Sequence, residues 1–180
     1  MVTLLLLTKT IAQDYKTSNG EISFFSEAPI ANVDAKNNKV KAELDTKSDE
    51  LTFKMAMADF KFKKNKMGKD AEKKYLETKK FPEASFVGKI DGSVDYKKPG
   101  SYPVTAKGKL KIHGVEKEVS EKGTITVSKG KIKLASAFKV LLKDYHIETP
   151  SILGKEMTSD NIAVKVNATL SEQGKQSAKK

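Results

Sequence analysis

Cysteine, tryptophan and arginine are all absent from this chain of 180 residues, and histidine occurs only twice. Without cysteine the protein can form no disulfide, thiolate nucleophile, iron–sulfur cluster or cysteine-based zinc site. Two histidines that lack carboxylate partners at metal-ligand spacing are a weak basis for a metal centre. We therefore expect neither a metal nor a cofactor.

The absence of arginine bears on whether the positive charge indicates binding to nucleic acid. All 34 cationic side chains are lysine, against 23 acidic ones, so the formal net charge is +11. Base-specific recognition of nucleic acid favours the planar guanidinium of arginine. Lys107, Lys109 and Lys111 occupy alternate positions, which is typical of the solvated face of a strand. Nucleic acid is thus a disfavoured partner, although a lysine-rich scaffold that binds nucleic acid or anionic envelope polymers stays as the alternative function.

The chain also lacks an apolar run long enough to span a bilayer as a helix, and its mean hydropathy is −0.50. A short apolar run, Val2 to Leu7, is followed by Lys9 and Ala12, and it resembles part of a secretory signal. We expect residues 1–12 to be a signal-peptide remnant, cleaved after Ala12, and the protein to be periplasmic or secreted. A disordered leader or a short first strand is the other interpretation of this segment.

From Gly20 onward apolar residues alternate with polar ones, and polar clusters interrupt the pattern at intervals typical of an antiparallel barrel. Helical periodicity appears over residues 67–79, and Phe81-Pro82 is expected to end this helix. Residues 143–161, a polar stretch that contains Pro150 and Gly154, are expected to form a loop or a short helix beside the barrel mouth. Turns are expected at Asn37-Asn38, Lys97 to Gly100, His113-Gly114 and Ser128 to Gly130. Strands are expected over residues 21–26, 39–44, 51–57, 85–90, 93–96, 104–112, 115–127, 132–142 and 162–170.

About eight strands with one or two short helices predict an all-β fold, a closed antiparallel meander barrel, because closure removes exposed strand edges. Such a barrel has room for its own side chains or for one small ligand. The side chains expected on its inner wall are aromatic and flexible apolar groups without titratable partners, which suits an alkyl chain. The candidate ligand-binding residues are Phe53, Met55, Met57, Phe60, Phe62, Phe86, Leu110, Ile112, Phe138 and Val140.

Two phrases of the sequence resemble the bacterial YceI-like family. The first runs from Tyr75 to Phe86 (YLETKKFPEASF), and the second runs from Gly108 to Val119 (GKLKIHGVEKEV). The resemblance covers roughly residues 14–171. It implies a lipocalin-like barrel in the periplasm that holds a long amphiphile, such as a polyisoprenoid, its pyrophosphate, or a fatty acid or amide.

No set of residues indicates catalysis, because the sequence has no nucleophile elbow, phosphate loop or placed carboxylate pair. His113 is expected to be a solvated or backbone-bonded turn residue. The lysines at 61, 63, 64 and 66 are expected to form a solvated run, with contact to a pyrophosphate as the other interpretation. We assign no catalytic residue.

The sequence therefore predicts a barrel domain over residues 13–171 and a disordered polar tail over residues 172–180. Its expected function is the non-enzymatic binding, storage or transport of a long-chain isoprenoid or fatty ligand. Loose contact with an anionic membrane surface and a homodimer are further partners that the sequence allows.

Overall fold

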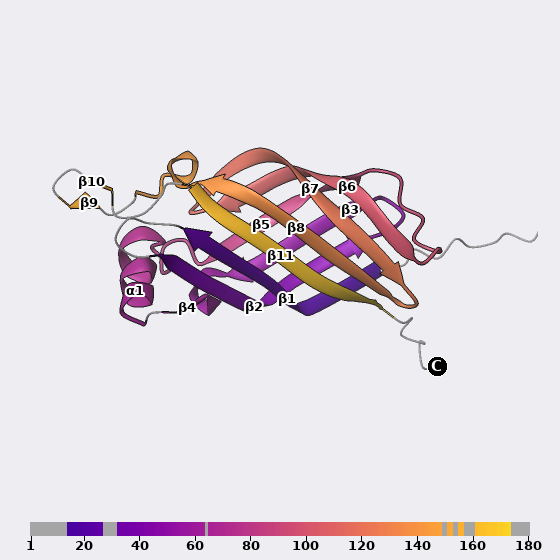
Figure 1. Cartoon of the computed structure of the whole chain (residues 1–180), viewed down its shortest axis with the longest axis horizontal. Coiled ribbons are helices and arrows are strands. Elements are labelled where there is room, and N and C mark those ends of the chain that lie inside the picture. Colours follow the sequence, from indigo (N-terminus) through magenta and orange to yellow (C-terminus); the bar gives the residue numbers. More distant parts are fainter. Residues whose placement is uncertain are drawn as a thin grey trace, which may run out of the picture.

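The period-two pattern folds into a closed antiparallel barrel, which confirms the predicted fold class (Figure 1). The computed structural model describes residues 14–26, 32–63, 65–148, 151–152, 155–156 and 161–173. Within this part of the chain the barrel has eight long strands. They are β1 (Asp14–Ser26), β2 (Val33–Asp45), β3 (Glu50–Ala56), β5 (Glu83–Asp91), β6 (Gly100–Ile112), β7 (Val115–Ser128), β8 (Lys131–Leu141) and β11 (Asn161–Glu172).

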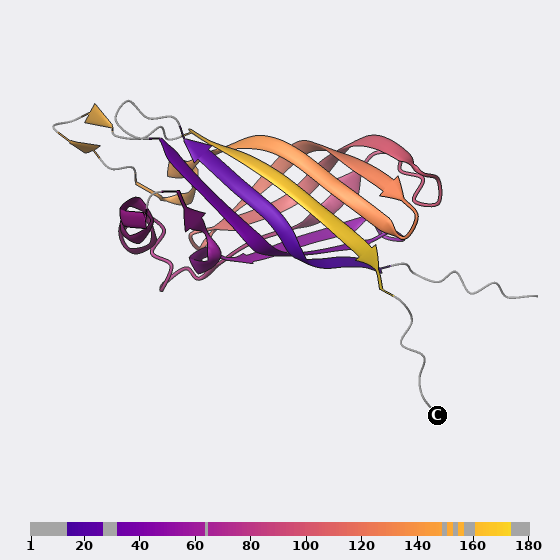
Figure 2. The same ribbon diagram turned by 60° about the horizontal axis from the view of Figure 1, so that its bottom comes forward.

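The strands follow the order β1-β11-β8-β7-β6-β5-β3-β2, and the pairing of β1 with β2 closes the ring. The short strand β4 (Lys61–Phe62) pairs with the beginning of β2. A separate small hairpin, β9 (Ser151–Ile152) with β10 (Lys155–Glu156), lies beyond one end of the barrel (Figure 2). The expected signal segment, residues 1–12, lies outside the described residues, as do residues 174–180 of the expected tail, whereas Glu172 still belongs to β11.

One end of the barrel is filled with side chains. Val40, Leu44, Ile132 and Leu170 are almost completely inaccessible to solvent there. The loop between β5 and β6 lies at this end, and its Tyr96 hydroxyl donates a hydrogen bond of 2.7 Å to the Asp49 carboxylate. Burial, followed by the interaction with Asp49, raises the pKa of Tyr96. This end, on the right in Figure 1, is therefore a packed core.

The opposite end carries the helices (Figure 1). They are the 3₁₀ turn η1 (Met57–Asp59), the helix α1 (Asn65–Asp70), the π-helical turn η2 (Ala71–Tyr75) and the 3₁₀ turn η3 (Leu142–Tyr145). The helix predicted over residues 67–79 thus ends earlier, because Glu77 adopts a left-handed backbone with φ of 42°. None of the helices in the described ranges has the length and apolar character of a membrane-spanning segment.

The turn predicted at Asn37-Asn38 is wrong. Strand β2 continues through both residues, and its register against β1 shifts there by one residue, which is a β-bulge. The buried Asn37 side chain donates to the Ala56 carbonyl oxygen (3.0 Å) and accepts from the Lys39 amide (2.8 Å). The polar pair therefore marks a bend within the strand, where a side chain replaces part of the backbone ladder.

Two other strand predictions need correction. Residues 93–96 do not form a strand but belong to the loop between β5 and β6. Strand β1 begins at Asp14, not at Glu21, because its polar first half pairs with the end of β2. Polar composition concealed this half of the strand.

The β6–β7 turn joins three segments at the helical end of the barrel. The turn residues His113 and Gly114 have φ of 52° and 77°, which is the geometry of a tight hairpin, so the predicted turn is confirmed. The His113 side chain is only 8% exposed, so it is not solvated. Its Nε2 lies 3.1 Å from a Glu77 carboxylate oxygen, and its Nδ1 lies 3.2 Å from the Tyr145 carbonyl oxygen. Both partners only accept, so both ring nitrogens donate when the two bonds coexist.

Replacing His113 by Asn is expected to lower the free energy of unfolding by about 1–3 kcal/mol, because two hydrogen bonds and the ring contact with Phe81 (centroids 4.1 Å apart) are lost. Asn tolerates the positive φ, so the backbone is not the cause. His146→Asn is the matched control, because exposed His146 has a similar φ of 54°. Urea unfolding measures both. Equal midpoints for the two variants would contradict this role of His113.

Gly88 and Gly108 face each other in the β5–β6 register, on the inner side of the wall. A Cβ atom at Gly108 would overlap the Val87 carbonyl oxygen and the Gly88 Cα, and one at Gly88 would lie 2.7 Å from the Phe86 ring. Gly108→Ala is therefore expected to lower the free energy of unfolding by about 2 kcal/mol or more. Gly100→Ala, on the same strand, meets only the flexible Tyr102 side chain and serves as the control. Equal thermal unfolding midpoints for the two variants would show that the barrel tolerates a Cβ atom at Gly108.

Candidate functional site

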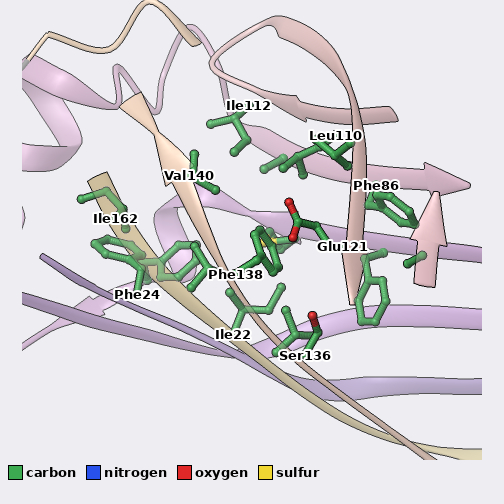
Figure 3. A pocket seen from close by; sticks show the side chains of 18 of the residues that line it. Ile22, Phe24, Phe86, Leu110, Ile112, Glu121, Ser136, Phe138, Val140 and Ile162 are labelled. Atoms are coloured by element: carbon green, nitrogen blue, oxygen red, sulfur yellow. The ribbon is translucent and has the colours of Figure 1, made fainter. Parts of the chain in front are cut away.

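The half of the barrel near the helices is hollow. It encloses a cavity of about 640 Å³, within the range of roughly 300–1,000 Å³ that is typical of small-molecule sites. Its wall consists of the inward-facing alternate residues of the long strands (Figure 3). The wall stops where the packed core begins, since Val40, Leu44, Ile132 and Leu170 do not line it.

All ten candidate residues from the sequence lie on this wall. Strand β3 and turn η1 contribute Phe53, Met55 and Met57, and the segment after η1 contributes Phe60 and Phe62. Strand β5, which pairs with β3, contributes Phe86 beside Phe53. Strands β6 and β8, further around the ring, contribute Leu110, Ile112, Phe138 and Val140. The structure brings them together around one space, and their contact with a ligand stays a prediction.

Several wall residues were absent from the sequence prediction. Phe24 on β1 packs against Phe60 and Phe62, with ring centroids 5.1 and 5.7 Å apart. The alternation of Ile22 and Phe24 in the first strand was the available signal for both. Others come from neighbouring strands, where the same alternation of inward and outward residues was the signal, and from the helical turns and loop at the open end, where no strand alternation could place them. They include Ala71, Tyr75, Leu76, Ile90, Val104, Leu142, Ile147, Ile162 and Val164.

Turns η2 and η3 narrow the open end of the cavity. Tyr75 and Leu76, which close η2, line the cavity together with Leu142 from η3 and Ile147. Tyr145 and Ile147 are buried in a small cluster with Leu110 and Val140. Because His113 bonds both to Glu77 and to the Tyr145 backbone, it holds the two covering segments near each other.

The backbone ladder between β7 and β8 is interrupted at the cavity wall. Strands β7 and β8 pair only from Gly123–Ser136 to Ser128–Lys131. At the last pair the Ser136 hydroxyl donates to the Lys122 carbonyl oxygen at 2.7 Å. Beyond it Glu121 and Phe138 continue their strands toward the open end, and both side chains project into the cavity (Figure 3).

The charged groups on the wall all have one sign. Among the described residues the acidic side chains that line the cavity are Asp70, Glu121 and Glu148, and no lysine is present. Asp70 forms an ion pair of 3.3 Å with Lys74. Burial raises the pKa of Glu121, and the pKa of Tyr145 is raised by burial and then by Asp144 and Glu121.

The described lysines of the run at residues 61–66 do not line the cavity. Lys61 and Lys63 are exposed and lie off the wall. Lys64 and the side chain of Lys66 lie outside the described residues. In the described part of the chain, no group of three or more His, Asp or Glu residues has the arrangement of a metal site. The cavity is thus suited to hold apolar matter.

Comparison with known proteins gives the same fold. A family model described as the YceI-like domain matches residues 14–170. A polyisoprenoid binding domain from Saccharophagus degradans has 12% identity and a TM-score of 0.75, with 91% of this chain and 100% of that chain covered. BcnA from Burkholderia cenocepacia has 15% identity and a TM-score of 0.69, with 83% and 95% covered. The YceI protein from Campylobacter jejuni has 20% identity and a TM-score of 0.63, with 83% and 90% covered.

No curated protein sequence matches this chain significantly. The family model, however, spans all eight barrel strands and both phrases that carried the resemblance. The chain therefore belongs to the YceI-like family.

Proposed function

We propose that this protein binds one long-chain amphiphile in its cavity without covalent chemistry, and that it stores or transports this ligand. The observation that carries the proposal is the contrast between the two halves of the barrel. One half is packed with side chains, whereas the other encloses a cavity of about 640 Å³ lined almost entirely by apolar groups. The YceI-like fold supports a hydrophobic ligand.

The energetics favour an alkyl or isoprenoid guest. An empty apolar cavity forfeits packing contacts and lowers stability. A guest restores these contacts, and each buried methylene contributes about 0.8 kcal/mol to its binding. Met55 and Met57 adapt their shape to an irregular chain. A hollow of this kind is therefore stabilised by the ligand that fills it.

The relatives support the class of ligand. The Saccharophagus degradans protein is described as a polyisoprenoid binding domain, and its fold aligns over 91% of this chain. By analogy we propose a polyisoprenoid or a fatty chain for the tail of the ligand here. This analogy concerns the apolar tail of the ligand and not its headgroup.

We further propose that the protein works in the periplasm or outside the cell, close to an anionic membrane. The apolar run from Val2 to Leu7 supports export. The exposed lysines of the barrel, such as Lys129, Lys131 and Lys133, support loose attraction to anionic lipids. A lipid ligand would have to come from that membrane.

The alternative, a scaffold for nucleic acid or other polyanions, is less well supported. Many surface lysines already face acidic partners, as in Lys36–Glu21 and Lys109–Glu116, which are both 2.9 Å apart. Such pairs divide the positive surface into a mixed one. No observation favours this alternative over ligand binding in the cavity.

Met55→Asp is expected to weaken uptake of a fluorescent prenyl or fatty probe by about tenfold or more, because a charge would replace a buried apolar wall group. Val87→Asp is the matched control, since Val87 is 54% exposed on a neighbouring strand. Ile112→Asp, nearer the open end, provides a second variant if Met55→Asp does not fold.

Organic extraction of gently purified protein, followed by mass spectrometry, is expected to yield one amphiphile for each chain. Protein that is empty and also takes up no probe would refute the proposed function. Salt-sensitive retention on a polyanion column that Met55→Asp leaves unchanged, without any probe binding, would favour the alternative.

The proposed export can be tested separately from ligand binding. Full-length protein expressed in a bacterium is expected in the periplasmic fraction, and its mass is expected to correspond to a chain that begins at Gln13. Fractionation and intact-mass spectrometry measure both. A chain of unchanged mass in the cytoplasmic fraction would exclude cleavage after Ala12.

A further inference from the structure

The inside of the barrel differs in charge from its outside. The chain has 34 lysines, but none lines the cavity among the described residues, where the ionised groups are all acidic. Two of the three acids lie on the covering segments, Asp70 at the end of α1 and Glu148 shortly after η3. Glu121 is different, because it belongs to the barrel wall itself.

Glu121 interrupts an apolar stripe. The inward alternation of β7 starts with Val115 and Lys117 at the open end and continues through Val119, Glu121, Gly123, Ile125 and Val127. Lys117 is exposed and does not line the cavity, so Glu121 is the charged residue that this strand contributes to the wall. Its register partner on β6 is Ala106, a small residue that leaves space in front of it. Figure 3 shows the carboxylate directed into the cavity among Phe86, Leu110 and Phe138.

This carboxylate has no hydrogen bond or ion pair with any described residue. The lysine beside it in sequence, Lys122, is exposed on the outer surface. A carboxylate in an apolar wall favours its protonated form unless a partner compensates, and burial accordingly raises the pKa of Glu121. The wall thus provides an acceptor, and the protein provides no donor for it.

We propose that the ligand ends in a protonated amine, and that Glu121 binds this ammonium group inside the cavity. The inference rests on the proposed function, since it specifies the headgroup of the amphiphile. An ammonium donates charge-assisted hydrogen bonds to a carboxylate, which are stronger than neutral ones. A pyrophosphate or a fatty carboxylate would meet like charges on the wall and no described cation.

The lysines on the surface do not reverse this preference. The screening length in physiological salt is about 8 Å. Exposed lysines such as Lys107 and Lys109 occupy outward positions of β6, and Lys117, which shares the inward alternation of Glu121, lies at the open end and does not line the cavity. Their charge acts on the approach of a ligand, whereas Glu121 acts on the bound headgroup. The two regions can therefore have opposite preferences.

The test is a competition experiment on the full chain. A neutral fluorescent apolar probe, N-phenylnaphthylamine, reports occupancy of the cavity, and dodecylamine, dodecanol and dodecanoate displace it with identical tails. Farnesyl pyrophosphate is the fourth competitor. At neutral pH, where the amine is fully protonated, dodecylamine is expected to bind at least about tenfold more tightly than dodecanoate.

Glu121→Gln is expected to weaken dodecylamine by about tenfold, to leave dodecanol nearly unchanged and to strengthen dodecanoate. Glu118→Gln, an exposed acid on the outer face of the same strand, is the matched control and is expected to change none of the three. Because burial disfavours the charged carboxylate, Glu121→Gln is expected not to lower the unfolding midpoint of the free protein. A lower midpoint would assign Glu121 a structural role and overturn the inference.

The outcomes separate the two proposals. If neither the fluorescent probe nor any competitor binds, the proposed function fails. If the probe and dodecanol bind but dodecanoate or farnesyl pyrophosphate binds as tightly as dodecylamine, the headgroup assignment alone is overturned. Tight amine binding that Glu121→Gln leaves unchanged would also overturn it.

Discussion

The pairing of β1 with β2 is the interaction on which the rest of the molecule depends. Because β1 also pairs with β11 on its other side, this pairing closes the sheet into a ring and leaves no long strand with an open edge. Once the sheet is closed, each side chain faces either the interior or the solvent, and neighbouring residues alternate between the two. The bulge at Asn37-Asn38 lies within this pairing. The hydrogen bond from Asn37 to the Ala56 carbonyl satisfies polar groups that the bulge would otherwise leave unpaired.

Closure alone does not produce a cavity, because the same barrel is solid at one end. At that end large aliphatic residues such as Leu44, Ile132 and Leu170 fill the interior, and the last two are register partners on the neighbouring strands β8 and β11. In the other half, small residues stand between the aromatic ones, among them the facing pair Gly88 and Gly108. The glycine pair lets β5 and β6 approach closely and leaves room for the Phe86 ring. The size of the space therefore depends on where glycine and alanine occur in the inward positions.

The fold and most of the wall could be predicted from the sequence, because strand alternation depends on neighbouring residues alone. The alternation of inward and outward residues predicted that Phe53, Leu110 and Phe138 face the interior, and all three line the cavity. The bulge in β2 and the loop over residues 93–96 were missed because composition does not distinguish them from a turn and a strand. Which half of the barrel is hollow depends on packing across the ring, between residues that are remote in sequence. The predicted hairpin at His113 was correct, but its contact with Glu77 joins positions that only the folded chain brings together.

Glu121 was overlooked for a related reason. A charged residue within a strand ordinarily faces solvent, and the sequence surrounds this one with lysines and glutamates. Glu121 is seen to face inward only when the alternation of inward and outward residues is traced back along β7 from the buried Ile125 and Val127. A partly desolvated carboxylate and an unfilled cavity each reduce the stability of a folded protein, and here both occur in the same half of the barrel. Gln at this position would keep the shape of the wall without the cost of burying a charge. The acid is therefore better explained by what enters the cavity than by what holds the barrel together.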